Sequence, residues 1–536
     1  MTPSSKPFDS VTPPSEEELT DIVVIGSGIG GLCCAALLAQ YGFAVTVCES
    51  HSIAGGAAHG FSRNGYTFDS GPSLHSGLSD PHSAHPLKQV LDAIGETVPC
   101  VTYDTWGCYL PEGELNIAVG ADPFCEVLQQ LRGRGAVQEW RKLQQVMEPL
   151  AAAAKAIPPT ALRWDWGAAI ATARFAPAVL PHLGNIVKLT GPFSRVMDEV
   201  IQDPFIRNWL DLLCFLLSGL PASGTSAAEM AFMFAEWYRP GVVLEYPIGG
   251  SGAIADALVR GLEKQGGRLR LNAHVEQVLV AGDSLRDSFA SRAVGVRLRG
   301  GKVIHARQAV VSNASVWDTL KLLPQDAVPK SFRDRRQGTP ACESFMHLHL
   351  GIDAAGLPAD LACHYIIVND WSQGITAPQN VVLVSIPSVL DPSLAPPGKH
   401  AIHVYTPGNE PYHLWAGLER NSAAYQDLKQ ERAEVMWQGL ERIIPDIRQR
   451  CEVTLVGTPL THERFLRRDR GSYGPAIAAG SGFFPGPTTP LSGLLCCGDS
   501  TFPGIGLPAV AASGAIAANT IAPLHKHLAL LKAIGF

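Results

Sequence analysis

A single stretch near the start of the chain, residues 21–56, restricts the possible folds more than any other part of the sequence. Residues 22–25 are an apolar run rich in β-branched side chains, which predicts a buried parallel strand. A glycine-rich turn follows, then a helix of small apolar residues over 32–41 and a second strand over 43–48. Strand, turn, helix and strand in this order predict a Rossmann-like βαβ unit in an α/β protein.

The turn between the first strand and the helix has glycines at the G-x-G-x-x-G spacing. The first glycine allows the tight turn, the second lets the backbone approach a pyrophosphate, and the third lets the helix pack closely on the strand. The cofactor-binding residues predicted from this turn are Gly26, Gly28, Ile29, Gly30 and Gly31.

An acidic residue, Glu49, ends the second strand. At this place in a βαβ unit a carboxylate accepts hydrogen bonds from the ribose hydroxyls of an adenosine. The same negative charge repels the 2′-phosphate of NADP. The unit therefore predicts FAD or NAD as the cofactor.

Two further segments follow the acid: the pair Gly55-Gly56 and the run Phe68-Asp69-Ser70-Gly71-Pro72-Ser73. With them the chain resembles the FAD-dependent flavoproteins built on two dinucleotide-binding folds, a group that includes amine oxidases, phytoene desaturases and carotenoid isomerases. The resemblance implies that FAD is the cofactor, that the acid and Gly-Gly wrap the pyrophosphate, and that the Asp-x-Gly-Pro turn comes near the flavin ring. It adds as site residues Ser50, Gly55, Gly56, Ala57, Gly71, Pro72 and Ser73. Ala57 stands where amine oxidases usually carry an arginine, which disfavours that branch.

Two later parts of the chain also match this group. In relatives, the backbone of the residue aligned with Val275 contacts the adenine, and the strands that follow close at Asn313. Near the C-terminus, an apolar strand ends in Gly498-Asp499 and leads through Gly506-Leu507 into a small-residue helix over 509–521. The resemblance implies that Asp499 bonds the ribityl chain, although a helix cap is equally compatible with it. The positive helix N-terminus would stabilise the negative charge of reduced flavin.

The length of 536 residues exceeds what one hydrophobic core usually serves, so we expect two intertwined domains. The fold class that we predict is α/β, with a Rossmann-like FAD-binding domain, an intertwined α+β substrate domain and a helical insertion. The expected boundaries are a disordered leader over 1–20, an FAD-binding domain formed by 21–121, 240–340 and 488–536, and a substrate-binding domain formed by 122–239 and 341–487.

The charge and hydrophobicity of the chain limit which molecules and membranes we expect it to bind. The net charge of −7 argues against a nucleic-acid partner. Two long uncharged runs, 22–48 and 500–524, are broken by glycine-rich turns, so we expect them to be buried in the FAD-binding domain and expect no transmembrane helix. The N-terminus lacks the basic and apolar regions of a signal peptide, and the scattered cysteines indicate a reducing compartment. These features favour a cytoplasmic protein, at most peripheral on an inner or photosynthetic membrane.

The first part of the expected substrate domain, 122–239, is rich in alanine, leucine and aromatic residues and is broken by prolines, which predicts a mainly helical insertion. Two interpretations of its apolar residues stay open: a face turned into the substrate domain, or a patch that lies on a bilayer and admits a lipid-soluble substrate. The apolar residues are Trp164, Trp166, Phe175, Leu180, Leu183, Ile186 and Val187, with Arg163, Arg174, Lys188 and Arg195 nearby.

Two histidines, His347 and His349, alternate with apolar residues over 345–352, so they lie on one side of a predicted strand. They could form a metal pair, but the sequence identifies no third ligand. A strand face turned toward solvent or the substrate cavity is the simpler interpretation, and we predict no metal site.

Several loops narrow the resemblance to the carotenoid-isomerase and phytoene-desaturase branch, namely 387–398, 461–465 and 471–475. The resemblance implies an enzyme that acts on a long apolar, carotenoid-like polyene. The leading hypothesis is cis–trans isomerisation of a poly-cis carotene by reduced flavin, without net redox change. The alternatives are a phytoene-type desaturase, a retinol-saturase-like reductase, a flavin amine oxidase, and a non-catalytic flavoprotein that handles pigments. The residues after Gly506, Leu507-Pro508, resemble the desaturases more than the isomerases.

Two residues are catalytic candidates because of their positions near the expected flavin. Glu245 precedes a Tyr-Pro turn, and His75 follows the Gly-Pro-Ser turn. A merely structural role is the competing interpretation of each. The oligomeric state is not predicted.

Overall fold

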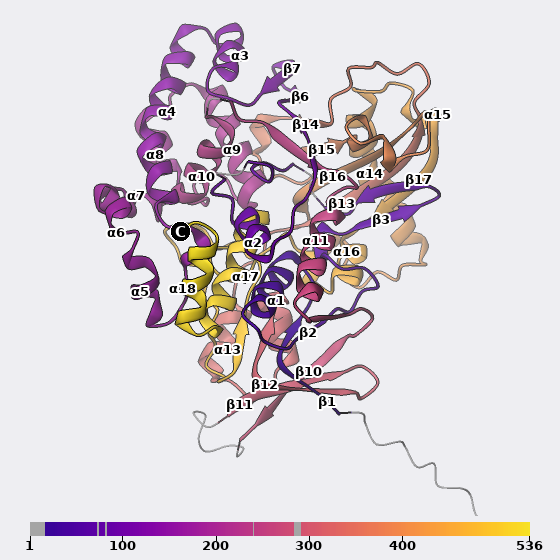
Figure 1. Ribbon diagram of the computed structural model, residues 1–536. Coiled ribbons are helices and arrows are strands. Elements are labelled where there is room, and N and C mark those ends of the chain that lie inside the picture. The colour runs from indigo at the N-terminus through magenta and orange to yellow at the C-terminus, as the bar shows by residue number, and fades with distance from the viewer. Residues whose placement is uncertain (1–16, 72–73, 81–82, 240, 283–290) are drawn as a thin grey trace, which may run out of the picture.

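Two seven-stranded sheets organise the chain in the computed structural model, which describes residues 17–71, 74–80, 83–239, 241–282 and 291–536 (Figure 1). The first sheet has the order β10-β11-β12-β1-β2-β9, with β18 beside β12. Its strands are β1 (Glu17–Ile25), β2 (Val45–Cys48), β9 (Arg268–Arg270), β10 (Val275–Ala281), β11 (Arg292–Leu298), β12 (Val303–Ser312) and β18 (Leu494–Cys496). β1 runs parallel to both β2 and β12, and its residues 22–24 are fully buried, as an apolar run in a parallel sheet requires.

The predicted βαβ unit is confirmed: β1 leads into α1 (Ile29–Gln40), which returns to β2. Three further helices pack against α1, namely α2 (Pro86–Ile94), α11 (Gly252–Lys264) and α17 (Leu507–Ile521). Small residues allow this contact, because a Cβ added to Gly514 of α17 would lie 2.2 Å from the carbonyl oxygen of Gly30. The two uncharged runs of the sequence are therefore neighbouring core segments. None of the helices in the described ranges is long and apolar enough to span a membrane.

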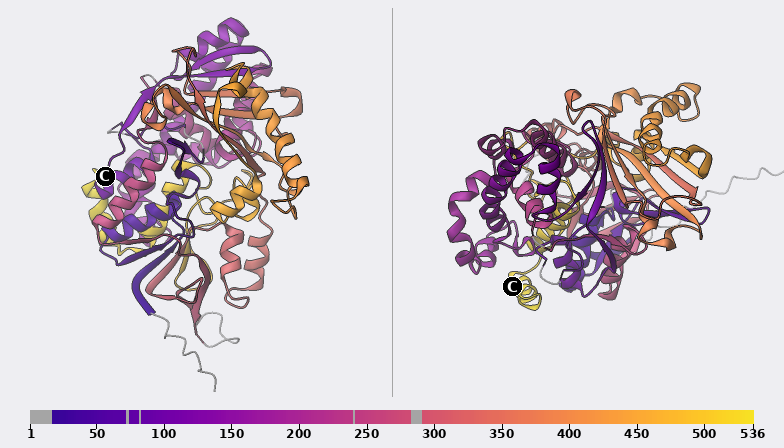
Figure 2. Two further views of the ribbon diagram at one scale, coloured as in Figure 1. Left: turned by 90° about the vertical axis from the view of Figure 1, so that its right-hand side faces the viewer. Right: turned by 90° about the horizontal axis from the view of Figure 1, so that it is seen from above.

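The second sheet has the order β17-β13-β16-β15-β14-β6-β7 and is antiparallel except between β14 and β6. Its strands are β6 (Thr105–Leu110), β7 (Gly113–Ala118), β13 (Ser344–Asp353), β14 (His364–Val368), β15 (Val381–Ser385), β16 (Lys399–Glu410) and β17 (Cys451–Gly457). One face packs against α14 (Ala423–Glu441) and the other against the helices of residues 122–239. Seen from above, those helices and the strands of the second sheet lie on opposite sides of the molecule (Figure 2).

The segment 122–239 is mainly helical, as predicted. Its helices are α3 (Pro123–Leu131), α4 (Arg134–Lys155), α5 (Gly167–Ala173), α6 (Ala176–Val179), α7 (Leu183–Leu189), α8 (Ser194–Val200), α9 (Pro204–Ser218) and α10 (Ala227–Trp237). Side chains fix the starts of the two helices that matter for the site. Asp203 caps α9, and Ser226 forms a capping box with Glu229 at the start of α10.

The remaining described elements connect these layers. The short strands form two pairs, β3 (Gly60–Arg63) with β4 (Tyr66–Asp69) and β5 (Cys100–Tyr103) with β8 (Leu244–Pro247). The remaining helices are α12 (Val316–Leu322), α13 (Lys330–Gln337), α15 (Ile447–Arg450), α16 (Pro459–Leu466) and α18 (Leu524–Ala533).

Two expected boundaries need correction. Residues 17–20 were assigned to a leader, but they belong to β1 and pair with residues 303–306 of β12; residues 1–16 lie outside the described ranges. β6 and β7 were assigned to the FAD-binding domain with 21–121, but they complete the second sheet beside β14. Local alternation predicts that a strand exists, whereas its partner depends on contacts with residues far along the chain.

The close packing of α1 on its own turn leads to the first prediction. A Cβ on Gly31 would lie 2.3 Å from the Gly26 carbonyl oxygen, so Gly31→Ala must displace backbone. We expect the variant to lose about 1–3 kcal/mol of unfolding free energy, the usual cost of overpacking. Gly135→Ala is the control, because a Cβ at that helix position meets nothing within 4 Å and alanine favours helix. Denaturant unfolding measures both, and equal stability of Gly31→Ala and the native chain would contradict the packing argument.

Candidate functional site

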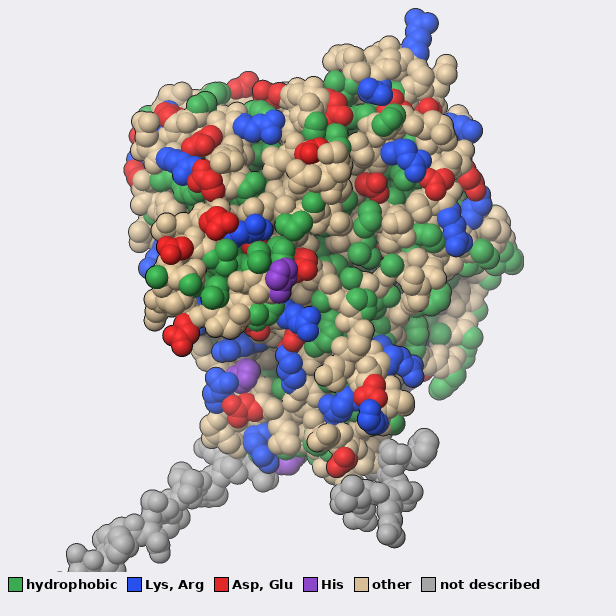
Figure 3. Space-filling model, turned by 180° about the vertical axis from the view of Figure 1, so that it is seen from behind, with side chains coloured by type: hydrophobic (Ala, Val, Ile, Leu, Met, Phe, Trp, Pro, Cys, Tyr) green, Lys and Arg blue, Asp and Glu red, His purple; other side chains and the backbone are tan. Residues whose placement is uncertain are grey.

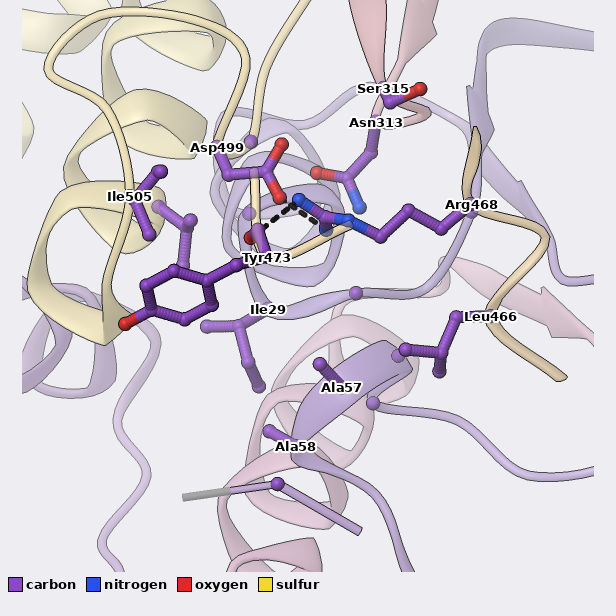
Figure 4. Close-up of a pocket in the computed structure, with 18 of the residues that line it drawn as sticks. Ile29, Ala57, Ala58, Asn313, Ser315, Leu466, Arg468, Tyr473, Asp499 and Ile505 are labelled. Atoms are coloured by element: carbon purple, nitrogen blue, oxygen red, sulfur yellow. Dashed lines mark hydrogen bonds and ion pairs between the residues drawn. The ribbon is translucent and has the colours of Figure 1, made fainter. Parts of the chain in front are cut away.

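A cavity of about 1110 Å³ lies at the carboxyl ends of β1, β2 and β12 and reaches the helices α9 and α10. Open parallel sheets bind ligands at this edge, outside the carboxyl ends of their strands. One end of the cavity is lined by the glycine-rich turn and the residues that follow β12 and β18 (Figure 4). The other end is lined by apolar residues of α9 and α10, so a polar and an apolar compartment share one space.

Two helices begin at the cavity without a side-chain cap from the described residues. The N-cap of α1 is Gly28, and the N-cap of α17 is Gly506. Gly28, Ile29 and Gly30 line the cavity at the first helix, and Gly506 and Leu507 at the second. Free backbone N–H groups and the positive end of the helix dipole make each of these places suited to an anion.

Glu49 is fixed beside the glycine turn by hydrogen bonds to both of its carboxylate oxygens. One oxygen accepts from the backbone N–H of Ser27 at 2.8 Å and from its hydroxyl at 2.7 Å. The other accepts from the backbone N–H of His51 at 2.7 Å and from the Ser50 hydroxyl at 3.2 Å. The carboxylate is thus held at the end of β2, where it lines the cavity.

Asn313 holds the glycine turn against the C-terminal corner of the site. A Cβ on Gly28 would lie 2.7 Å from the Asn313 side-chain nitrogen, and one on Gly498 would lie 2.6 Å from its oxygen. Gly56 approaches the turn as closely, because its Cβ would lie 2.9 Å from the Gly28 Cα. The glycines therefore keep open a trough that larger residues would fill.

Asp499 is paired with an arginine that the sequence analysis did not select. Arg468 forms an ion pair with Asp499 and donates from its second terminal nitrogen to the Tyr473 carbonyl at 2.8 Å (Figure 4). Ser500 donates a hydrogen bond to the other Asp499 oxygen at 3.1 Å. Arg468 lies between two arginines in a short basic run, where sequence alone does not distinguish a site residue from a solvated one.

Comparison with known proteins agrees with this geometry. Residues 29–522 match the family model described as flavin containing amine oxidoreductase. A chloroplastic prolycopene isomerase from an Oncidium hybrid cultivar is 34% identical over 523 residues, which cover 95% of this chain and 84% of that protein. A neurosporene-forming phytoene desaturase from Rhodobacter capsulatus is 26% identical, with 93% of each chain covered. The solved structure of an oxidoreductase from Methanosarcina mazei has a TM-score of 0.60 at 20% identity and covers 92% of this chain and 98% of that one.

The fold and these matches define an FAD-dependent oxidoreductase. The chain belongs to the flavin-containing amine oxidoreductase family, and the predicted resemblance, fold class, enzyme class and cofactor are confirmed.

The cavity brings together most of the residues predicted to bind the cofactor. Those that line it are Gly26, Gly28, Ile29, Gly30, Glu49, Ser50, Gly55, Gly56, Ala57, Gly71, Val275, Asn313, Gly498, Asp499, Gly506 and Leu507. Gly31 is not part of the lining; it packs against Gly26, in line with the helix-packing role expected of the third glycine. Pro72 and Ser73 lie outside the described residues. The contact of each residue with FAD stays a prediction.

The two catalytic candidates have different surroundings. Glu245 does not line the cavity, and its oxygens accept hydrogen bonds from the backbone N–H groups of Leu78 at 2.5 Å and Ser79 at 2.8 Å. This arrangement favours the structural interpretation of Glu245. His75 does line the cavity, and burial lowers the pKa of its imidazole to about 4, so the ring is neutral at pH 7.

His347 and His349 gain the third neighbour that the sequence did not identify. His403 lies opposite His349 on β16, and nitrogens of the three buried rings lie within 4.8 Å of one another. The ring planes are within 18° of parallel, and His347 Nδ1 is 2.9 Å from His403 Nε2. In-plane lone pairs of parallel rings do not converge on one point, so this arrangement does not favour a metal ion. Of the two alternatives for this strand face, solvent or the substrate cavity, the structure supports the cavity, because both histidines are buried and His347 lines the cavity.

The acid after β2 provides a test of cofactor binding. Glu49→Gln removes the charge that we predict to accept the ribose hydroxyls, so we expect FAD affinity to fall about 10- to 100-fold, the usual loss for one charge-assisted contact. Titration of the apoprotein with FAD, followed by flavin fluorescence, measures it. Glu434→Gln on the exposed side of α14 is the control. An unchanged FAD dissociation constant would contradict the role of Glu49.

Proposed function

We propose that this protein isomerises cis double bonds of a long apolar polyene, most simply a poly-cis carotene, with FAD in its reduced form and no net redox change. One observation carries the proposal: the dinucleotide end of the cavity continues into an apolar compartment. That compartment is lined by Leu213, Leu216, Leu217, Phe232, Met233 and Trp237. The similarity to a prolycopene isomerase over nearly the whole chain supports the same substrate class.

A wall of flat rings suits a conjugated substrate. Phe345 and His347 on β13 and Tyr405 on β16 line the cavity, and the rings of Phe345 and His347 are 5.5 Å apart at 17°. Burial lowers the pKa of His347, so its ring is uncharged. A polyene would therefore meet stacked neutral rings on this side.

The chain's own contribution to the reaction is orientation, electrostatics and exclusion of water. FAD, when bound in its reduced form, would supply negative charge beside the polyene and so stabilise a state in which a cis double bond has a lower bond order. The uncapped start of α17, at Gly506 and Leu507, would stabilise the negative charge of the reduced cofactor. The apolar residues of α9 and α10 would hold the substrate away from water.

Desaturation is the second candidate. The Leu507-Pro508 sequence at the start of α17 resembles the desaturases, and the similarity to a phytoene desaturase covers 93% of the chain. Both reactions would use the same cavity and the same substrate class, and they differ in the redox state of the cofactor that acts.

A patch on the helical insertion offers a route for a lipid-soluble substrate. Large apolar side chains of residues 164–187 are exposed, Trp166 and Val187 to 76% and 79%. From behind, hydrophobic side chains gather along the right-hand edge of the molecule, where α5–α7 lie (Figure 3). We propose that this patch rests on a bilayer. Arg163, expected beside the patch, is instead buried and paired with Asp165.

The reaction is tested by incubating oxidised and dithionite-reduced holoenzyme with a poly-cis carotene under anaerobic conditions. We expect the reduced enzyme alone to change the geometry of the polyene at unchanged length, because no net electrons leave the substrate. Chromatography with absorption spectra separates the products. A lengthened chromophore from the oxidised enzyme would support desaturation instead. Flavin that no donor reduces would favour a non-catalytic role, and peroxide released with amines would favour an amine oxidase.

The membrane patch gives a separate prediction. The double change Trp166→Asp, Val187→Asp should weaken binding to phospholipid vesicles at least about tenfold, because each large apolar side chain contributes roughly 1.5–3 kcal/mol when buried. Vesicle flotation measures the bound fraction. Leu271→Asp, at a residue 40% exposed next to the first sheet, is the control. Equal flotation of the double variant and the native chain would exclude this patch as the docking surface.

A further inference from the structure

The apolar end of the cavity contains a buried carboxyl group that the sequence analysis did not select, Glu236 on α10. Its side chain is on the helix that also contributes Phe232, Met233 and Trp237 to the lining. Glu236 is 4% exposed, and its Oε2 has no hydrogen-bond partner among the described residues. A buried polar atom without a partner is costly, so its presence in a cavity indicates a role toward a ligand.

Other buried glutamates in the described part of the chain have structural partners. Glu410 pairs with Arg432, Glu49 accepts hydrogen bonds through both oxygens, and Glu245 accepts two backbone N–H groups. Glu236 differs because one of its oxygens has no partner in the part of the chain that the structure describes. Gly77 makes room for that oxygen, since a Cβ on Gly77 would lie 3.0 Å from it.

The surroundings favour the protonated form of this carboxyl group. Burial raises the pKa of Glu236, and this effect outweighs the opposing influence of Lys155 and Arg239. Two imidazoles also line this part of the cavity, those of His75 and His85. Burial lowers their pKa values to about 4 and about 3, so neither adds a positive charge that would favour the carboxylate at pH 7.

We propose that Glu236 is the catalytic acid of the isomerisation, a role that rests on the function proposed above. The O–H bond of the Glu236 carboxyl breaks, and its proton bonds to one carbon of a cis double bond through the π electron pair of that bond. The substrate becomes a delocalised carbocation and Glu236 a carboxylate. Rotation about the resulting single bond follows. A proton then leaves the same carbon for the carboxylate, the double bond re-forms in the trans geometry, and no electrons are gained or lost overall.

The cavity suits such a cation. The Glu236 carboxylate left by the transfer and the negative charge of reduced flavin both stabilise positive charge on the polyene. The neutral histidines add no repulsion. The apolar side chains of α9 and α10 exclude the water that would otherwise capture the cation.

Incorporation of deuterium from D₂O into the product distinguishes this proton-transfer mechanism from isomerisation without proton transfer. Reduced holoenzyme in D₂O exchanges the carboxyl proton, so a deuteron is added to the polyene and, because C–H breaks faster than C–D, is retained in the product. We expect mass spectrometry to find deuterium in the isomerised product. Glu236→Gln, which cannot donate this proton, should lower kcat about 100-fold or more with FAD content and KM little changed. Glu236→Asp should restore part of the turnover together with the label.

The matched control is Glu229→Gln, the same change two turns earlier on α10 and outside the cavity, which should keep native turnover. Isomerised product without deuterium would overturn the acid role of Glu236, and so would full turnover by Glu236→Gln. Flavin content and circular dichroism show whether each variant is folded; if Glu236→Gln does not fold, the label in the native and Glu236→Asp products decides. Unreacted carotene with the native reduced enzyme would instead overturn the proposed function itself, and this role with it.

Discussion

The site depends on close contacts between backbone segments around α1. Gly31 lets the first turn of α1 contact the carbonyl of Gly26, and Gly514 of α17 lets that helix contact the carbonyl of Gly30. Two helices that begin far apart in the sequence therefore start side by side at one edge of the sheet, and the side chain of Asn313 fills the space between the turn and Gly498. Any added methyl group at these positions would move a helix start, and the uncapped N–H groups would no longer point at the same ligand.

The path of the chain explains how a polar and an apolar compartment come to share one cavity. The chain builds β1, α1 and β2 first, leaves for β6, β7 and the insertion, and returns for α11 and β9 to β12. It then completes the second sheet and returns once more for β18 and α17. Because each departure begins at the carboxyl edge of the first sheet, the insertion and the second sheet lie above that edge and enclose it. A cofactor bound to the first sheet would thereby face a substrate held by the other two layers.

Local sequence patterns predicted what is local in this structure. The glycine turn, Glu49 and the helical character of 122–239 follow from spacing and composition over a few residues, and the Gly498-Asp499 corner was indicated by the resemblance to the flavoproteins. The partners of β6 and β7, the position of His403 opposite His349 and the pairing of Arg468 with Asp499 depend on residues far along the chain, and no local pattern identifies them. Glu245 shows that a residue close to a conspicuous sequence motif need not belong to the site. It is close in sequence to a conspicuous turn, yet its carboxylate accepts hydrogen bonds from the backbone N–H groups of Leu78 and Ser79.

The carboxyl groups at the two ends of the cavity have different surroundings, and this difference affects the chemistry that each group can perform. At the dinucleotide end, both oxygens of Glu49 accept hydrogen bonds and Asp499 is paired with Arg468. At the apolar end, Glu236 lacks such partners, and burial raises its pKa. The same functional group is thus a fixed hydrogen-bond acceptor at one end and a proton donor at the other, set only by what surrounds it. Carboxyl groups with such different surroundings would allow one cavity both to bind the hydroxyls of a nucleotide and to protonate a hydrocarbon, which has no polar group of its own to offer.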